Sequence, residues 1–502
     1  MTETPSTAVE VPAVRQLIDG QWGSPSVDLG VNLENPNTGT VISRQRATAD
    51  ADVERVAAAA SRVHDSGSWS SLPAKERADH LEAIADGLDA EALSIAALES
   101  LGTGAIIRTT GMLAFVINGG AFRLAATLLR EGILSSTMDG PTGKPAEIHH
   151  LPWGPALSLV PWNAPAPMAA HKLANSLAAG CPSILKPSEW APYGTTTLGE
   201  VIDRVLTERG VAAGTFQMVQ GGPHVGGLLV NDPRVRAISF TGGLGGGRAI
   251  AAACAYDFKP AQLELGGNNA IVVLDDADVD AAAEGIVDLM TQLNGQWCRA
   301  LGRLILPDGI ADDVLAAVSE RLAHVRIGDS LSPESDMGPI VHSAHLATLT
   351  NRVAELVGNG GTAHSSTPLP DLGGNFLAPT LITGVSSADA RDEIFGPVAT
   401  VHRAASDAEL VGLANDTPFG LEGYVFAGDE GRGLEVARQV RAGGVKVNGS
   451  TMLSLNLFAP RPAWGLSGQG AEGTRETLLF FTNSRVVGVE NLSAADLARM
   501  AG

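Results

Sequence analysis

From residue 155 onward, short β-rich runs alternate with helical patterns, and this alternation constrains the fold more than any other feature of the chain. Residues 156–162 (ALSLVPW) favour a strand, and residues 167–180 (PMAAHKLANSLAAG) favour a helix that ends at a C-capping glycine. The pattern continues in three predicted strands and one predicted helix, at 183–188, 216–221, 236–243 and 194–210. Strands joined by helices at this interval form right-handed crossovers, so a parallel sheet is expected.

A second set of alternating elements begins at residue 269. It comprises a predicted strand at 269–276, a helical run around 286–290, a strand at 302–308 and a helix at 312–325. Two α/β domains are therefore expected. In open α/β sheets, ligands bind beyond the carboxyl ends of the strands, so the residues that follow each strand are the informative ones.

Two helical segments, 51–65 and 76–101, precede this region. Their apolar residues recur at helical spacing, which predicts one buried face on each helix. The predicted buried residues are Val53, Val56, Ala57, Ala60 and Val63 in the first segment, and Leu81, Ile84, Leu88 and Leu93 in the second. The most apolar stretch, 109–122, lies between two arginines and is expected to be too short to span a bilayer.

Charge and cysteine usage exclude several classes of protein. The formal net charge of −21 disfavours nucleic acids and anionic membranes as partners, because both bind clustered Lys and Arg. Three cysteines without paired spacing predict neither a disulfide framework nor a zinc site. Adjacent His149 and His150 would point to opposite faces of an extended segment, which argues against a metal site. With no secretory signal pattern at the N-terminus, a cytoplasmic location is expected.

Three segments that follow predicted strands carry residues suited to chemistry, and each also has an ordinary structural interpretation. Asn163 could donate a hydrogen bond to an oxyanion, or belong to a turn that caps the next helix. Lys186 and Glu189 could bind ribose hydroxyls, or lie in a polar loop. Residues 240–248 (FTGGLGGGR) could bind phosphate through backbone N–H groups, or form a flexible loop.

Three further segments centre on Glu264, Cys298 and Glu393. Glu264, in LELGGNN, is flanked by leucines, and partial burial would raise its pKa as a general base requires; a buried structural carboxylate is the alternative. Cys298, in NGQWCRA, suits a nucleophile or an inert buried thiol. Glu393 precedes a Phe-Gly-Pro turn in EIFGPV.

In this order and at these separations, the segments resemble the NAD(P)-dependent aldehyde dehydrogenase superfamily. The match runs from LESLGTG through PWNAP, KLANSLAAGCPSILKPSE, FTGG, LELGGNN, NGQWC, EIFGPV and NDTPFGL to GGVKVNG and a weakened SGQG. Each motif alone is a weak signal, but six collinear motifs are specific. The resemblance implies an α/β fold with a Rossmann-like cofactor domain, an α/β catalytic domain and a small β oligomerisation arm.

The resemblance also implies catalytic roles. Cys298 would attack the aldehyde carbonyl to give a thiohemiacetal, and Asn163 with the backbone N–H of Cys298 would stabilise the oxyanion. Hydride transfer to the nicotinamide would leave a thioester, and Glu264 would activate the water that hydrolyses it to the carboxylic acid. Lys172 is expected near the active site in a supporting role. The partner is therefore a small-molecule aldehyde.

The expected cofactor is NAD rather than NADP. Glu189 beside the adenosine ribose would repel a 2′-phosphate. By resemblance, Lys186 and Glu189 would hold the adenosine ribose and Glu393 the nicotinamide ribose. The other residues expected to contact the cofactor are Trp162, Ser188, Phe240, Thr241, Gly242, Gly243, Leu265 and Phe395.

Several positions depart from the family's pattern. Ala164, Leu455 and Arg461 stand where aromatic residues are usual, and Gly243 stands where a hydroxyl residue is common. Fewer rings would widen the substrate tunnel, so the expected aldehyde is bulky: cyclic, aromatic or terpenoid. Arg299 and Arg461 leave open a substrate with a distal carboxylate. The residues expected to line the tunnel are Ala164, Met168, His171, Trp297, Arg299, Leu455 and Arg461.

Two other interpretations of the resemblance remain. One is a coenzyme-A-acylating semialdehyde dehydrogenase, in which a thiol resolves the thioester; the retained Glu264 argues against it. The other is a catalytically idle binding or structural relative, suggested by the altered segments 243–247 and 460–470. The presence of Cys298, Glu264 and Asn163 together argues against an idle protein.

The resemblance predicts three domains. They are an NAD-binding domain of residues 1–135 and 155–265, a catalytic domain of residues 266–466, and an oligomerisation arm of residues 136–154 and 478–502. An exposed strand pair in the arm is an edge that needs a partner, so a homodimer or homotetramer is expected.

Overall fold

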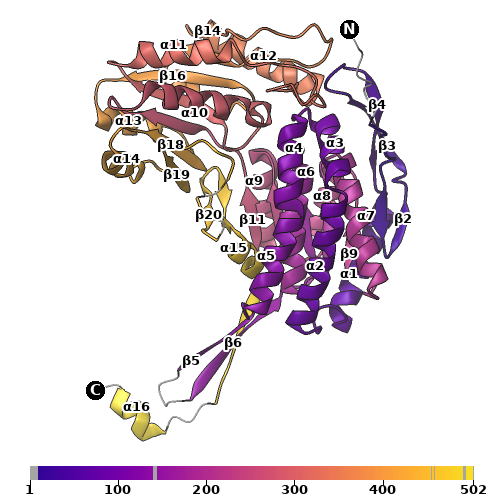
Figure 1. Ribbon diagram of the computed structural model, residues 1–502. Coiled ribbons are helices and arrows are strands. Elements are labelled where there is room, and N and C mark those ends of the chain that lie inside the picture. Colours follow the sequence, from indigo (N-terminus) through magenta and orange to yellow (C-terminus); the bar gives the residue numbers. More distant parts are fainter. Residues whose placement is uncertain (1–8, 140–143, 454, 457, 490–492, 501–502) are drawn as a thin grey trace.

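The computed structural model describes residues 9–139, 144–453, 455–456, 458–489 and 493–500. Within them the chain forms two α/β units and a slender arm (Figure 1). Residues 1–8 of the predicted NAD-binding domain lie outside the described residues, as do 140–143, 490–492 and 501–502 of the predicted arm. The predicted α/β fold class is confirmed.

The first sheet, as far as the chain is described, has eight strands in the order β2-β1-β9-β8-β7-β10-β11-β22. Its strands are β1 (Gln16–Ile18), β2 (Gln21–Gly23), β7 (Ala156–Leu159), β8 (Ser183–Lys186), β9 (Phe216–Met218), β10 (Ala237–Thr241), β11 (Ala261–Glu264) and β22 (Gly468–Gln469). Strands β7 to β11 are parallel to their neighbours within this group. The strand order reverses between β7 and β10, which makes this the topological switch point of the sheet.

Helices cover both faces of the first sheet. Alternate strand residues point to opposite faces: Leu157 and Ile184 pack under α1, α8 and α9, whereas Leu185 packs under α2, α5, α6 and α7. The helices of this unit are α1 (Asp50–Ser66), α2 (Ala74–Ala90), α3 (Ala92–Thr103), α4 (Ile107–Leu113), α5 (Gly119–Arg130), α6 (Pro165–Ala179), α7 (Tyr193–Glu208), α8 (Pro223–Asn231) and α9 (Leu244–Tyr256).

The second sheet has seven strands among the described residues, in the order β14-β15-β16-β13-β12-β18-β19. These are β12 (Asn269–Val273), β13 (Leu301–Pro307), β14 (Thr362–His364), β15 (Thr380–Thr383), β16 (Val398–Ala404), β18 (Glu422–Phe426) and β19 (Gly444–Val447). One face packs against α10 (Val279–Thr291) and α11 (Ala311–Leu322), and the other against α13 (Asp407–Ala414) and α14 (Glu430–Ala437). Helix α12 (Ser343–Gly358) packs beside β15.

The arm projects from the first unit, near α5 and α15, on the side away from the second unit (Figure 1). It is a three-stranded antiparallel sheet, in the order β24-β6-β5, of β5 (Ser135–Asp139), β6 (Pro145–Pro152) and β24 (Thr482–Val487). Helix α15 (Thr474–Phe480) leads into β24, and α16 (Ala494–Met500) follows it. Three two-stranded antiparallel sheets complete the described fold: β3 (Val27–Glu34) with β4 (Val41–Ala47), β17 (Phe419–Gly420) with β21 (Trp464–Gly465), and β20 (Arg461–Pro462) with β23 (Ala471–Glu472).

Two expectations about the first helices need correction. The predicted single helix over 76–101 breaks at Glu91, between α2 and α3. The break rotates the following residues, so Leu93 is 72% exposed and Ile95 is buried in its place.

The apolar stretch near residue 110 is longer than predicted. A continuous helical run from Ile107 to Arg130 comprises α4, a π-helical turn at Ala114–Asn118 and α5, and by length and composition it could cross a membrane. The expectation that it is too short is therefore wrong. Half of the run is buried inside the protein, where Phe122 and Leu129 pack with Leu81 and Leu88 of α2. It lies here as a core helix.

Candidate active site

The carboxyl ends of four strands lie level at one edge of the first sheet. Lys186 pairs with Leu159, Leu159 with Phe240, and Thr241 with Glu264. Parallel strands in this register bring the segments that follow them together. The sheet register therefore gathers the predicted motifs at the switch point, where open α/β sheets bind ligands.

A strained turn presents Cys298. Helix α10 ends at Thr291, and Leu293, Asn294 and Gly295 then take positive φ angles of 47°, 59° and 69°. Positive φ is rare for leucine and costs about 1–3 kcal/mol, so the surrounding structure must hold this conformation. Asn294 supplies part of that support: its Nδ2 donates to the carbonyls of Gly104 and Pro339.

Two asparagines connect the cysteine loop to the rest of the site. Asn163 donates from Nδ2 to the carbonyl of Gln296, 2.9 Å away, which leaves the second N–H of this amide for another acceptor. Asn269 donates from Nδ2 to the carbonyl of Cys298 at 2.9 Å and to that of Ala300 at 2.7 Å. Asn163 and Cys298 therefore lie on adjoining segments that are held in fixed relation.

Burial and like charge set the acidity of Cys298 and Glu264. Burial raises the pKa of the Cys298 thiol to about 12; Arg299 opposes this rise, and Glu264, Glu393 and Glu472 add to it. Burial, and next the charge of Glu472, raise the pKa of Glu264 to about 8. Oε1 of Glu264 is buried without a hydrogen-bond partner among the described residues. The thiol is thus protonated at rest, and Glu264 titrates near neutrality.

Lys172 lies in a fully buried polar network. Its Nζ donates to Oγ of Ser239 at 2.8 Å and to Oε1 of Glu472 at 3.2 Å. Burial opposes ionisation of Glu472, yet Lys172, His171 and Arg461 together hold its pKa at about 2. The sequence analysis did not single out Glu472. Its only signal is its place two residues after SGQG, and the β20–β23 sheet brings it to Lys172.

The cations around Cys298 have partners within the protein. Arg299 forms an ion pair with the buried carboxylate of Glu422. Arg461 lies 3.8 Å from Glu472. Lys446 of β19 donates to the carbonyls of Thr451 and Leu453 at 2.6 and 2.9 Å. The positive charges of this region are therefore already neutralised or solvated by the protein.

The glycine-rich start of α9 is open. A Cβ at Gly243 or Gly245 would have no atom within 4 Å, and Oγ1 of Thr241 has no partner in the described part of the chain. By contrast, a Cβ at Gly242 or Gly246 would collide with the ring of Phe240. An open helix start with free backbone N–H groups and an unused hydroxyl fits the phosphates of a dinucleotide.

Other predicted cofactor residues surround this opening. Lys186 Nζ lies 3.8 Å from Oε2 of Glu189. Ser188, which lies between these two residues in the sequence, is also buried. The side chain of Leu265 fills the space that a Cβ at Gly247 would need. A lysine and a carboxylate at the end of β8, beside the switch point, fit the hydroxyls of a ribose.

Glu393 is held against the LELGGNN segment. Its Oε1 accepts from the backbone N–H of Gly267 at 2.8 Å, and a side chain at Gly266 would collide with this carboxyl. Burial raises the pKa of Glu393 to about 7, although the Gly267 N–H opposes the rise. Glycines at 266 and 267 are therefore required for the close approach of Glu393 and of the Cys298 carbonyl.

An aromatic cluster joins the two units, and it adds Trp190, His342 and His345, which the sequence analysis missed, to the predicted Trp162 and Phe395. The Trp162 ring meets the edges of Phe395 and His345 at 5.4 and 5.3 Å, and His342 stacks on Trp190 at 3.9 Å. Nε2 of His345 donates to the carbonyl of Phe395 at 2.8 Å. The histidines follow no motif; only the packing of α12 against the end of β7 reveals them.

Four of the predicted tunnel residues lie near Asn163 or Cys298 or are buried behind them, whereas Leu455 lies at the surface. Ala164 and Met168 lie at the start of α6, beside Asn163, and Trp297 lies beside Cys298 and packs partly against the core of the second unit. His171 is buried behind them, where its Nε2 lies 3.3 Å from Thr477 Oγ1 and burial lowers its pKa to about 4. Leu455, in contrast, is 77% exposed.

Comparison with known proteins places this geometry in a family. Residues 24–487 match the aldehyde dehydrogenase family. Glutarate-semialdehyde dehydrogenase of Pseudomonas aeruginosa is 33% identical over 469 residues, which are 91% of this chain and 94% of that protein. Geranial dehydrogenase of Castellaniella defragrans is 32% identical over 466 residues, which are again 91% of this chain and 94% of that protein.

A solved structure agrees with these relatives. Betaine aldehyde dehydrogenase from Staphylococcus aureus in complex with NAD⁺ is 29% identical and superposes with a TM-score of 0.89, over 97% of this chain and 97% of that one. The resemblance inferred from the motifs is therefore confirmed: the chain belongs to the aldehyde dehydrogenase family.

Proposed function

We propose that this aldehyde dehydrogenase oxidises a bulky, uncharged aldehyde, such as a cyclic, aromatic or terpenoid one, to its carboxylic acid with NAD. The observation that carries the substrate proposal is that Arg299 and Arg461 already face Glu422 and Glu472. A substrate carboxylate beside either arginine would lie close to one of these buried carboxylates, and like charges at a buried site disfavour each other. An uncharged aldehyde leaves both pairs in place.

The relatives do not decide this question by themselves. One is a geranial dehydrogenase and another is a glutarate-semialdehyde dehydrogenase, so an uncharged and a carboxylated substrate are both represented. The ion pairs of this chain favour the first. The small side chain of Ala164 at the start of α6 also favours it, because a residue without a ring leaves more room beside Asn163.

In the proposed reaction, Cys298 attacks the carbonyl carbon of the aldehyde, and its thiol proton passes to water as the carbon–sulfur bond forms and the carbonyl π bond breaks. The free N–H of Asn163 and the backbone N–H of Cys298 donate to the oxygen on which negative charge develops. Because the resting thiol is protonated, Arg299 beside it assists by stabilising the thiolate.

Nicotinamide in its oxidised form, when bound, supplies the hydride acceptor that this chemistry requires. Lys186, Ser188 and Glu189 would hold one ribose, and Glu393 the other. The open start of α9 with Thr241 would hold the phosphates, and Trp162 and Phe395 would pack against the cofactor. Glu189 places a negative charge at the first ribose, which favours NAD over NADP.

Glu264 completes the reaction. As a carboxylate it removes a proton from water, whose oxygen attacks the thioester carbon; the carbon–sulfur bond breaks, and the thiol of Cys298 and the carboxylic acid are released. A pKa of about 8 lets this group act as a base near neutral pH. Lys172 and Glu472 lie behind Glu264 and set the charge around it.

The arm supports a further part of the proposal, a homodimer or homotetramer. Apolar side chains on its described strands are exposed, with Met138 at 62% and Val486 at 67%, and its edge strands β5 and β24 have unpaired outer sides. Such edges are usually covered by another copy of the chain. All three cysteines are free, as a reducing cytoplasm would leave them.

Steady-state kinetics test the substrate and cofactor together. NADH formation is followed with geranial, benzaldehyde, acetaldehyde and glutarate semialdehyde, each with NAD or NADP and with or without coenzyme A. We expect the highest kcat/KM for geranial or benzaldehyde with NAD, and no dependence on coenzyme A. A preference for glutarate semialdehyde or acetaldehyde contradicts the substrate proposal, and a requirement for coenzyme A contradicts hydrolysis by Glu264.

A further inference from the structure

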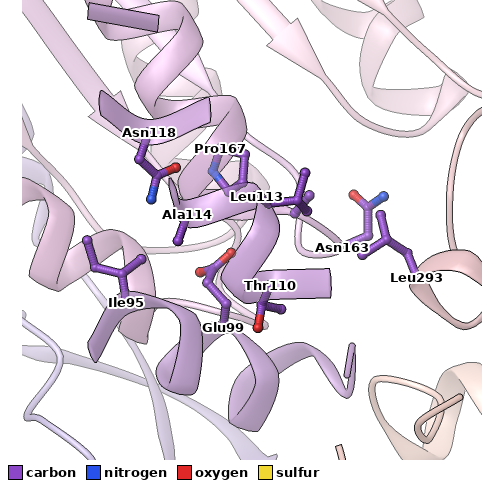
Figure 2. Close-up of a pocket in the computed structure, with 10 residues that line it drawn as sticks. Ile95, Glu99, Thr110, Leu113, Ala114, Asn118, Asn163, Pro167 and Leu293 are labelled. Carbon is purple, nitrogen blue, oxygen red and sulfur yellow. The ribbon is translucent and has the colours of Figure 1, made fainter. Parts of the chain in front are cut away.

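A small cavity with four polar side chains in its lining lies beside Asn163 (Figure 2). It is lined by α3, α4, the π-helical turn at Ala114–Asn118 and the start of α6, and it has room for about one water molecule. Its polar walls are Glu99, Thr110, Asn118 and Asn163. None of these except Asn163 belongs to the predicted catalytic or cofactor residues.

The start of α6 depends on one of these walls for its cap. Pro165 and Pro167 have no N–H, so Ala166 supplies the only backbone donor of these three residues. The N-cap residue, Ala164, has no side chain that could accept from it. Instead, Oε2 of Glu99, which comes from α3, accepts from the Ala166 N–H at 3.1 Å. Ala166 is only three residues beyond Asn163.

Three buried polar atoms of the cavity lining have no partner in the part of the chain that is described. These atoms are Oε1 of Glu99 and both Nδ2 and Oδ1 of Asn118, whose side chains are 5% and 0% exposed. Figure 2 shows the two side chains directed into the same space. Buried polar groups are almost always satisfied, and a water in this cavity would satisfy them.

The surrounding elements keep the two groups in place. The π-helical turn exposes Phe115 and Val116 and turns Asn118 inward. Helix α7 also packs against Glu99, because a side chain at Gly194 would collide with Oε1 of its carboxyl. Four helical segments, namely α3, α4, the π-helical turn and α6, therefore surround the cavity into which the Glu99 carboxyl points.

We propose that Glu99, with a water held between it and Asn118, is a positioning residue that fixes the first turn of α6 and thereby the amide of Asn163. The inference rests on the proposed role of Asn163 as the oxyanion donor. Burial raises the pKa of Glu99 to about 8, although the Ala166 N–H opposes the rise. The group is then protonated at neutral pH, and it can accept from Ala166 while donating to the water.

Two substitutions in the full-length enzyme separate positioning from folding. Glu99→Gln keeps an oxygen for the Ala166 N–H and a donor for the water, so it should retain most of kcat. Glu99→Leu removes the cap and should lower kcat by up to about 100-fold, the loss that a displacement of about 1 Å can cause. The Kd of NAD, measured by fluorescence titration, should stay unchanged in both variants. Equal kcat in the Gln and Leu variants overturns the proposal.

A double-mutant cycle with Asn163→Ala gives the decisive result. If Glu99 acts through Asn163, the loss caused by Glu99→Leu should disappear once Asn163 is alanine, because the two effects share one interaction. Independent, multiplicative losses overturn the inference. If Asn163→Ala alone leaves kcat unchanged, the proposed oxyanion role fails instead, so the two failures are distinguishable.

Asn118→Leu extends the test if Glu99→Leu does not fold. It removes both water partners contributed by the π-helical turn and leaves the Ala166 cap intact. We expect a smaller fall in kcat than for Glu99→Leu, again with no further effect when Asn163 is alanine. An unchanged kcat, or a fall that persists in full in the Asn163→Ala background, contradicts the role of the water.

Discussion

Cys298 and Glu264 illustrate how burial determines chemistry at the scale of single residues. Both groups lie close to other carboxyl groups, which raise the pKa of each beyond the effect of burial alone. The consequence for Glu264 is opposite to that for a solvated glutamate: it is largely protonated below about pH 8 and becomes a base above it. The hydrolytic half of the reaction should therefore depend on pH in a specific direction.

The pH dependence of kcat tests this consequence. Because only the deprotonated form of Glu264 can remove a proton from water, kcat should be low at pH 6, rise through about pH 8 and level off above it. In Glu264→Gln the rise should vanish, while a rapid first turnover of NADH remains. Steady-state and stopped-flow rates over this pH range provide the measurement. A Glu264→Gln variant with the wild-type pH profile would show that another group is the base.

Residues within collinear motifs could be identified from the sequence, and isolated polar residues could not. Cys298, Glu264 and Asn163 stand in recognisable segments. Glu472, by contrast, is a single glutamate outside the predicted site residues, and Glu99 lies in the matched segment LESLGTG, where nothing local predicts its contact with Ala166. The β20–β23 sheet brings Glu472 to Lys172, and the packing of α3 against α6 brings Glu99 to Ala166. Such long-range contacts do not follow from local spacing.

At the scale of elements, the start of α9 has glycine at residue 243, where the resemblance leads us to expect a hydroxyl residue. Gly243 is the N-cap of the helix, with extended φ and ψ of −74° and 154°, and it provides no side-chain cap. Its Cβ position is open, so neither strain nor crowding requires glycine there. A serine would fit, and its hydroxyl could donate to a bound phosphate.

Gly243→Ser should therefore tighten cofactor binding. One additional hydrogen bond to a charged group contributes about 1.5 kcal/mol, which corresponds to about a tenfold lower Kd for NAD. Gly243→Ala is the matched control, because it adds the same Cβ without the hydroxyl and should leave Kd close to the wild-type value. Isothermal titration calorimetry gives both values. If the two variants bind NAD equally well, the start of α9 does not contact the phosphates.

The element order was largely predictable, and the errors have local causes. The alternation from residue 155 predicted strands β7 to β10 and helices α6 and α7, because each buried strand is a short apolar run; helix α8, between β9 and β10, was not predicted. The error at Leu93 arose because the α2–α3 break at Glu91 carries no Gly or Pro. The run from Ile107 to Arg130 was underestimated because it continues past Arg123, which forms an ion pair with Asp86 at the surface.

At the scale of the whole molecule, the arm is the part whose apolar side chains and strand edges stay uncovered within the described part of a single chain. Its strands are far apart in sequence, since β24 pairs with β6 more than 300 residues away, and only the family resemblance predicted that they meet. The exposed valines of β24 have no core of their own to cover them. A second copy of the chain is the proposed cover.

Substitution on β24 tests the assembly. Val486→Glu should shift the proposed dimer or tetramer to a smaller species, because it buries a charge at the interface. Leu93→Glu, on the exposed side of α3, is the control and should leave the assembly unchanged. Size-exclusion chromatography with light scattering gives the masses. A monomeric wild-type protein, or an equal effect of both substitutions, would rule out the arm as the interface.

The acyl-enzyme on Cys298 is the central claim of this account, and intact-protein mass spectrometry tests it most directly. Glu264→Gln, mixed with benzaldehyde and NAD, should form NADH once and accumulate a benzoyl group on the protein, because hydrolysis of the thioester is blocked. Peptide mapping should place this group on Cys298, and Glu264→Gln/Cys298→Ala should form neither NADH nor the adduct. One turnover of NADH with Cys298 unmodified, or turnover without Cys298, would contradict the mechanism.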